Sequence, residues 1–185
     1  MWLWILLIVG SCFSTGVNSA PRRKYLCPPE FVRYGGSCYY FSKHMATWFE
    51  AHFQCKDRNS ELAVMEKGWE DRNMRSYLNK VELARLERWL GGIYNWELKR
   101  WVWGANGGNP LKYQGFSMLK KGDDHRWECI IMDPVKNYKW SNRYCIESKH
   151  FICETPLKRL KPPRPHATKP KKPRRRRPPK NTNAI

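Results

Sequence analysis

The sequence lacks the spacings with which cysteine and histidine usually hold zinc. Neither a C-x-x-C nor an H-x3-H pair occurs among its 7 Cys and 5 His residues, and structural zinc sites are built from such pairs. No motif joins a nucleophile to a base and an orienting group, because none of the histidines has a recognisable catalytic context: these are His44, His52, His125, His150 and His166. We therefore expect no metal site and no catalytic residue, and the chain is predicted not to be an enzyme.

A hydrophobic run of membrane-spanning length is also missing. Residues 2–10 are almost unbroken apolar, but a transmembrane helix needs about 20 such residues. Asn18-Ser19-Ala20 offers a small-residue cleavage site before Pro21-Arg22-Arg23. We predict a signal peptide over residues 1–20 and a secreted, extracellular mature chain without a transmembrane segment; a membrane anchor is the alternative.

Acidic residues are absent from residues 157–185, although this segment holds twelve of the chain's 35 Lys and Arg residues and seven of its 13 prolines. Because it has almost no apolar side chains, the segment cannot bury enough surface to offset the entropy lost on ordering. We predict a disordered, basic, Pro-rich tail over residues 156–185, with local polyproline II character.

The basic run of the tail predicts binding to polyanions. Flexible blocks of cations bind polyanions by releasing counterions, and their affinity falls as the salt concentration rises. The residues expected to do this are Lys169, Lys171, Lys172, Arg174, Arg175, Arg176 and Arg177. Because the leader predicts export, the expected partners are glycosaminoglycans, microbial surface polymers or acidic membranes, and no nucleic acid is expected.

The cysteines that are present predict a disulfide framework. Removing the leader also removes Cys12 and leaves an even set of six: Cys27, Cys38, Cys55, Cys129, Cys145 and Cys153. An even count in an exported chain indicates disulfides formed in an oxidising compartment. The count alone leaves the pairing open.

Between these cysteines the pattern is mixed α and β. Thr47 is expected to cap a helix in which Trp48, Ala51 and Cys55 share one face, and a second helix is expected over residues 69–78. Strands are expected over residues 38–42, 89–94, 99–103 and 151–153, with a central pair over 129–132 and 138–140. Residues 104–127 form a long irregular loop, which in a compact domain usually carries a ligand site. The fold class predicted is α+β, with two helices and small antiparallel sheets.

Several motifs, taken in order, resemble the C-type lectin-like domain. They are Cys27-Pro28 with Cys38, Thr47-Trp48-Phe49-Glu50-Ala51 with Cys55, Trp89-Leu90-Gly91-Gly92, the run from Trp140 to Cys145, and Phe151-Ile152-Cys153-Glu154. The match covers most of the mature chain, so the domain is placed at residues 21–155. The resemblance implies the long form of the domain, with an extra N-terminal hairpin bridge. It also implies three disulfides: Cys27–Cys38, Cys55–Cys153 and Cys129–Cys145.

The resemblance also raises the question of calcium. Many sugar-binding members of the family hold the ion between a Pro-containing triplet in the long loop and a Trp-Asn-Asp on a late strand. Here Trp140-Ser141-Asn142 lacks the carboxylate, and Lys120-Lys121-Gly122-Asp123 lacks the proline and adds two ammonium groups. Calcium requires six to eight oxygen ligands, many of them carboxylates. We expect no cofactor; calcium is the alternative, with an incomplete set of ligands.

Other residues of the loop are candidates for ligand binding. The aromatic side chains of Trp96, Tyr113, Phe116 and Trp127 are suited to stacking on sugar rings; the alternative is that Trp96 caps a hairpin and Trp127 belongs to the core. The acidic residues Asp123, Asp124 and Glu128, near His125, either bind a ligand or metal or form a solvated patch. Ser141 and Asn142 complete the candidate ligand-binding set. Four tryptophans are assigned to the core: Trp89, Trp101, Trp103 and Trp140.

These patterns predict a secreted C-type lectin-like protein that binds carbohydrate without the family's usual calcium site and binds polyanions through its tail. Two alternatives remain open. One is a protein-interaction or matrix module whose sugar site has decayed and which the tail tethers; the other is a cationic antimicrobial protein.

Overall fold

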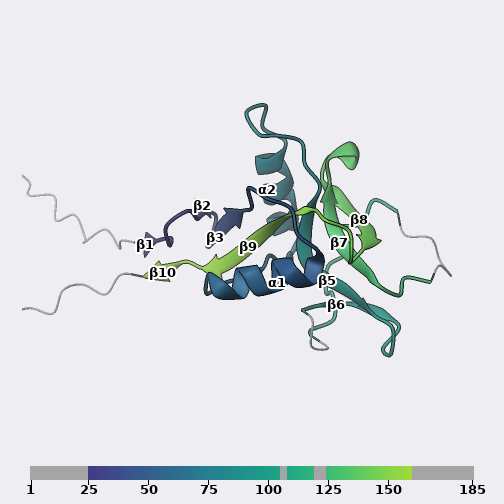
Figure 1. Ribbon diagram of the computed structural model, residues 1–185. Helices are drawn as coiled ribbons and strands as arrows, with labels where there is room; N and C mark the ends of the chain where they lie inside the picture. Colours follow the sequence, from purple (N-terminus) through teal and green to yellow (C-terminus); the bar gives the residue numbers. More distant parts are fainter. Residues whose placement is uncertain (1–24, 105–107, 119–123, 160–185) are drawn as a thin grey trace, which may run out of the picture.

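The computed structural model of the protein describes residues 25–104, 108–118 and 124–159 (Figure 1). The predicted signal peptide, Asp123 and the seven tail residues expected to bind polyanions lie outside these ranges. The described chain runs in the order β1 (Tyr25–Leu26), β2 (Val32–Tyr34), β3 (Ser37–Phe41), α1 (Trp48–Asp57), β4 (Glu61–Leu62), α2 (Gly68–Leu78), β5 (Arg88–Asn95), β6 (Arg100–Trp103), β7 (Glu128–Asp133), the short 3-10 helix η1 (Pro134–Lys136), β8 (Lys139–Tyr144), β9 (His150–Pro156) and β10 (Lys158–Arg159). The α+β fold class and the two helices are confirmed.

Eight of the strands form one sheet. Its order is β2-β3-β9-β5-β7-β8, with β4 paired to β9 and β6 paired to β5. The pairs are antiparallel except β5 with β9, which is parallel and aligns Arg88 with His150 and Trp89 with Phe151. This parallel pair joins the expected antiparallel parts into a single mixed sheet. The predicted central pair is corrected in one respect: β7 lies inside the sheet, but β8 ends it.

Helix α1 begins where its local sequence predicts. Thr47 is the N-cap: its side chain accepts a hydrogen bond from the Glu50 backbone N–H, and the Glu50 carboxylate accepts one from the Thr47 N–H at 2.9 Å. This reciprocal arrangement satisfies two backbone donors that a helix start leaves unpaired. Trp48, Ala51 and Cys55 are fully buried, as their spacing predicts.

Hydrophobic clusters cover both faces of the sheet. Along β7, Ile130 and Met132 belong to one cluster and Cys129 and Ile131 to the other, as expected because successive strand residues point to opposite faces. The first cluster contains buried residues of α2, and the second contains the buried face of α1. The predicted core tryptophans are confirmed: Trp89, Trp101, Trp103 and Trp140 are all at most 7% exposed.

Three disulfides link these parts, and their pairing is the one that the family resemblance implies. Cys55–Cys153 joins α1 to β9, Cys129–Cys145 joins β7 to the end of β8, and Cys27–Cys38 closes the N-terminal hairpin. The first and last strands, β1 and β10, pair with each other. In Figure 1 they lie at the end of the molecule opposite to β6 and β8. No helix within the described ranges is long and apolar enough to cross a membrane.

Candidate functional site: a groove between two exposed tryptophans

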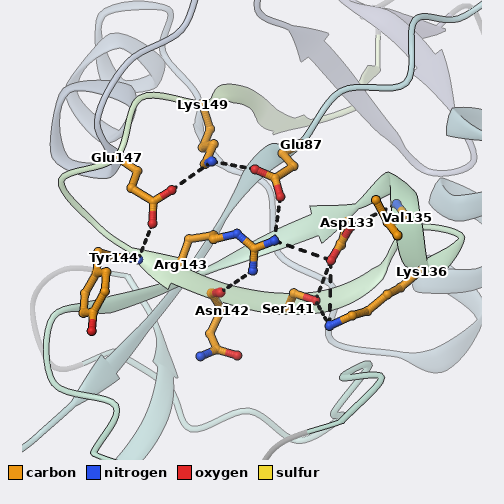
Figure 2. A network of polar contacts seen from close by, with 10 residues as sticks. All are labelled: Glu87, Asp133, Val135, Lys136, Ser141, Asn142, Arg143, Tyr144, Glu147 and Lys149. Carbon is orange, nitrogen blue, oxygen red and sulfur yellow. Dashed lines mark hydrogen bonds and ion pairs between the residues drawn. The ribbon is translucent and has the colours of Figure 1, made fainter.

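Strand β8 sends Ser141 and Asn142 to opposite faces of the sheet. The Ser141 side chain is buried; its hydroxyl donates to Asp133 Oδ2 at 2.9 Å and accepts from Lys136 Nζ at 2.9 Å. Figure 2 shows the two contacts beside η1. Asn142 lies on the other face, with Trp140. The two residues, both in the predicted ligand-binding set, therefore face opposite sides of the sheet, since side chains alternate along a strand.

Ser141 belongs to a chain of alternating charges on that face (Figure 2). Asp133 is 2% exposed, and Lys136 Nζ and Arg143 Nη2 each lie 3.8 Å from its Oδ2. Arg143 Nη2 also forms an ion pair with the Glu87 carboxylate at 2.7 Å, and Lys149 Nζ forms a second ion pair with the same carboxylate at 2.6 Å. Each buried charge thus has an opposite neighbour, as a charge away from water requires. The network joins β7 to β8 and engages the Ser141 hydroxyl both as a donor and as an acceptor.

On the other face, His125, Glu128 and Asn142 form what we call the histidine cluster. Glu128 Oε2 lies 2.8 Å from His125 Nδ1 and accepts from Asn142 Nδ2 at 2.8 Å. The His125 ring centroid lies 5.4 Å from that of Tyr94 and 5.6 Å from that of Trp101. The predicted candidates Glu128 and Asn142 are thus brought together, but the Glu128 carboxylate is already bonded to both Asn142 and His125.

The described residues do not fit the family's usual calcium site. Among the described residues, the one carboxylate that bonds to Asn142 is that of Glu128, whereas calcium requires six to eight oxygens. Asp124 is exposed and accepts from Arg126 Nε at 2.7 Å, and this hydrogen bonding from Arg126 lowers the pKa of its carboxyl. Across the part of the chain that the structure describes, no group of three or more His, Cys, Asp or Glu residues is placed to hold a metal ion.

Two of the predicted sugar-stacking residues pack on the core instead. The rings of Tyr113 and Phe116 each lie 5.5 Å from that of Trp140, and both side chains are partly buried. Gly115 between them admits no side chain, because a Cβ there would lie 2.6 Å from Trp140 Cε2. These residues hold the described part of the long loop against the first hydrophobic cluster.

A buried carboxylate, Asp71 of α2, anchors this part of the loop. It is fully buried and accepts from Trp140 Nε1 at 2.8 Å and from the Tyr113 hydroxyl at 3.1 Å. Burial raises the pKa of the Asp71 carboxyl, and the nearby Arg75 opposes this shift. Asp71 was not among the predicted site residues, although it precedes Met74 and Leu78 at positions that place all three on one helical face.

The other two stacking candidates, Trp96 and Trp127, line one groove of about 340 Å³. Trp96 is 56% exposed and Trp127 is 71% exposed, so the alternative that Trp127 belongs to the core is excluded. Trp96 does lie in the turn between β5 and β6, as the hairpin alternative proposed. We call this cleft the tryptophan groove; its lining is Phe49, Ile93, Tyr94, Asn95, Trp96, Glu97, Val102, Trp127 and Cys145.

Backbone hydrogen bonds from Cys145 tie two other segments of the chain together beside the tryptophan groove. The Cys145 N–H donates to the Trp127 carbonyl at 2.8 Å, and the Cys145 carbonyl accepts from the Trp48 N–H at 2.9 Å. This second bond places Phe49, the next residue of α1, on the groove wall. On the opposite side, the Asn95 side chain accepts from the Leu98 N–H at 2.8 Å and shapes the turn that carries Trp96.

Phe49 and Glu97 also line the groove but were not among the predicted ligand-binding residues. For Phe49 a signal existed: it is apolar but lies off the helix face that Trp48, Ala51 and Cys55 share. The lectin C-type domain model matches residues 44–155 of the chain, which span α1, the groove and the histidine cluster. The chain belongs to the C-type lectin domain family.

Known C-type lectins are similar to this chain along most of its length. It is 23% identical over 152 residues to the galactose-specific lectin nattectin of Thalassophryne nattereri, covering 80% of this chain and 92% of that protein. It is 30% identical over 132 residues to perlucin of Haliotis laevigata, covering 69% and 82%. The solved structure of the Ca2+-independent C-type lectin SPL-2 from Saxidomus purpuratus matches with a TM-score of 0.60 and 25% identity, over 70% of this chain and 93% of that one.

In this C-type lectin domain, the candidate ligand residues thus fall into separate places. Trp96 and Trp127 share the exposed groove, Glu128 and Asn142 belong to the histidine cluster, Tyr113 and Phe116 cover the core, and Ser141 lies on the opposite face. The tryptophan groove is the one of these places that combines exposed aromatic rings with a cavity.

Proposed function

We propose that the protein is a secreted lectin that binds glycans in the tryptophan groove. The observation that carries the proposal is the pair of exposed indole rings, Trp96 and Trp127, on one groove. The apolar face of a pyranose ring stacks on such rings, and aromatic residues supply much of the contact energy of binding sites. Asn95 and Glu97 add polar groups at the rim that are able to hydrogen-bond hydroxyls.

We further propose that binding does not require calcium at the family's usual site. Support comes from the histidine cluster, in which the Glu128 carboxylate already bonds to both Asn142 and His125. The likeness to SPL-2, a Ca2+-independent C-type lectin, points the same way. Because nattectin is named as galactose-specific, galactosides belong among the first sugars to test.

Three further parts of the proposal come from the sequence. The signal peptide would direct the chain to the extracellular space, and no catalytic residue is assigned. The basic tail would bind polyanions through Lys169, Lys171, Lys172 and Arg174, Arg175, Arg176 and Arg177.

The test is glycan-array binding of the mature chain, first in calcium and then in EDTA. We expect the same glycans to bind in both buffers. Trp127→Ala and Trp96→Ala should each weaken binding roughly tenfold, which corresponds to about 1.4 kcal/mol. The matched control is Trp69→Ala, which removes an exposed indole that lies on α2, outside the groove; it should bind as the parent does.

Each result that contradicts the proposal would lead to a different conclusion. Loss of binding in EDTA would show that calcium is required, and unchanged binding by both groove variants would remove the groove from the proposal. Failure to bind any glycan in either buffer would favour a protein partner for the folded domain.

A further inference from the structure

A second cavity, of about 150 Å³, lies next to the tryptophan groove, and we call it the side cavity. Its lining includes His52 of α1, Leu62 of β4, Val64, Gly91 of β5 and Trp103 of β6. None of these residues lines the tryptophan groove, so the two cavities are separate hollows in the surface.

The two cavities are lined by neighbouring residues of the same three elements. On α1, Phe49 lines the groove and His52 lines the side cavity, three residues or about 4.5 Å apart along the helix. On β5, Ile93 lines the groove and Gly91 the side cavity, two residues or about 7 Å apart. On β6 the two linings are one residue apart. This spacing is close to the length of one sugar residue in a chain, so a linked pair of sugars can reach both cavities.

The walls of the side cavity are mainly apolar. Leu62 and Val64 contribute aliphatic side chains. At Gly91 the wall is backbone, because a Cβ there would lie 2.9 Å from the Leu62 carbonyl oxygen and 3.3 Å from Val64 Cγ1. The volume is less than half the 340 Å³ of the groove. A cavity of this size and lining suits a small, partly apolar substituent better than a whole sugar ring.

His52 adds a polar group to this lining. Its ring stacks on that of Trp48, with centroids 5.7 Å apart and an interplanar angle of 9°. Burial lowers the pKa of His52, and the charge of Lys56 acts in the same direction. The ring is therefore neutral at physiological pH and carries one donor and one acceptor nitrogen. Glu61, which also lines the cavity, forms an ion pair with Lys56.

We infer that the side cavity is a second glycan subsite, which receives the acetamido group of the sugar residue next to the one in the tryptophan groove. The acetamido methyl packs against Leu62 and Val64, and the amide hydrogen-bonds to the His52 ring. A hydroxyl in the same position would leave the apolar walls unfilled. The ligand is thus a chain of at least two sugars, the second of them an N-acetylhexosamine.

The inference rests on the proposed function, because it takes the first sugar to lie in the tryptophan groove. The two can nevertheless fail separately. Binding of a single sugar depends on the groove alone, whereas the gain from a second, N-acetylated residue depends on the side cavity.

The experiment uses a glycan array on which each terminal sugar is presented alone, linked to a hexose, and linked to the matching N-acetylhexosamine. For the terminal sugars that bind, we expect the N-acetylhexosamine form to bind roughly fourfold more tightly than the hexose form, since the two differ by one buried methyl group and its amide. Equal binding of the two forms would overturn the inference and leave the groove in place. Failure of every glycan to bind would overturn the proposed function and the inference together.

Variants that fill the side cavity locate the effect. His52→Trp from one wall and Val64→Leu from the other should each abolish the preference for the N-acetylhexosamine form. Both should leave binding of the terminal sugar unchanged, which also shows that they are folded. Phe53→Trp is the matched control: it lies on α1, is 64% exposed and lines neither cavity, so it should keep the preference. A preference that survives in both filling variants would overturn the inference.

Discussion

Trp127 combines two unfavourable features on the surface. Its backbone φ of 66° lies in the left-handed region, which strains a bulky L residue, and its indole is 71% exposed. Backbone strain of this kind costs on the order of 1–3 kcal/mol and is concentrated at functional sites. A residue that contributes little to the core at this cost is best explained by what its side chain contacts from solvent.

Glycine and alanine at position 127 should separate the strain from the binding. Glycine adopts positive φ without strain, whereas alanine keeps it, so Trp127→Gly should be about 1 kcal/mol more stable than Trp127→Ala. Both variants lack the indole and should lose glycan affinity equally. Urea unfolding and glycan titration of the pair measure the two effects. Equal stability of the two variants would contradict the strain, and retained affinity in either would contradict the binding role.

Glu154 makes stability depend on pH. Its carboxylate accepts from the Tyr39 hydroxyl at 3.1 Å and from the Val64 N–H at 3.2 Å, yet burial raises the pKa of the carboxyl. Between the unfolded pKa, near 4.3, and the raised folded pKa, the native state holds a proton that the unfolded state has released. This group therefore contributes less stability as the pH rises through that window.

Glu154→Gln removes this titration. The free energy of unfolding of the parent minus that of the variant should fall as the pH is raised from 4 to 7, because only the parent loses stability through this group. Urea unfolding at several pH values in that range gives the difference. Glu82→Gln, at an exposed position in the loop after α2, is the control for loss of one negative charge. A difference that rises with pH would contradict the sign.

At the scale of secondary-structure elements, α1 is the helix whose first turn depends most directly on local hydrogen bonds. Thr47→Ala removes the acceptor for the Glu50 N–H and half of the reciprocal cap, so it should lower the free energy of unfolding by about 1 kcal/mol. Thr47→Ser keeps a hydroxyl in place and should restore most of the loss. The midpoint of urea unfolding reports both. A Ser variant as unstable as the Ala variant would show that the threonine methyl, and not the cap, matters.

Elements with local signals were predictable, and those fixed by distant contacts were not. The cap at Thr47 can be identified from neighbouring residues, and it occurs. The parallel pairing of Arg88 with His150 has no local signal, because it depends on how the chain crosses the sheet. The disulfide pairing came from the family resemblance, since the cysteine count alone left it open.

In the candidate site, too, some features follow from local sequence signals and others depend on distant contacts. Alternation along β8 is enough to place Ser141 and Asn142 on opposite faces of the sheet. Which face carries Ser141 is set by its contacts with Asp133 of β7 and Lys136 of η1. Neither the exposure of Trp127 nor its positive φ is indicated by composition. Tyr113 and Phe116 looked equivalent to Trp96 in sequence and differ only because Trp140 and Asp71 hold that part of the loop inward.

At the scale of the whole molecule, two of the disulfides are expected to stabilise the fold by different amounts, because they close loops of different length. Cys55–Cys153 closes a loop of 98 residues across both helices, and Cys129–Cys145 closes one of 16 beside the groove. In the chain-entropy description, bridges of these lengths restrict the unfolded chain by about 5 and about 3 kcal/mol. All four cysteines are at most 2% exposed, so replacing either pair removes similar buried atoms.

Paired alanine variants should therefore differ in two ways. Cys55→Ala with Cys153→Ala should lose roughly 1.5 kcal/mol more stability than Cys129→Ala with Cys145→Ala. The second pair, although the milder in stability, should reduce glycan binding more, because Cys145 lines the tryptophan groove and its backbone positions both Trp127 and α1. Guanidinium unfolding measures which variant is less stable. Glycan titration, at a temperature where both variants are folded, measures which one binds more weakly. If the pair that is less stable also binds more weakly, binding follows global stability, and the bridge beside the groove has no local role.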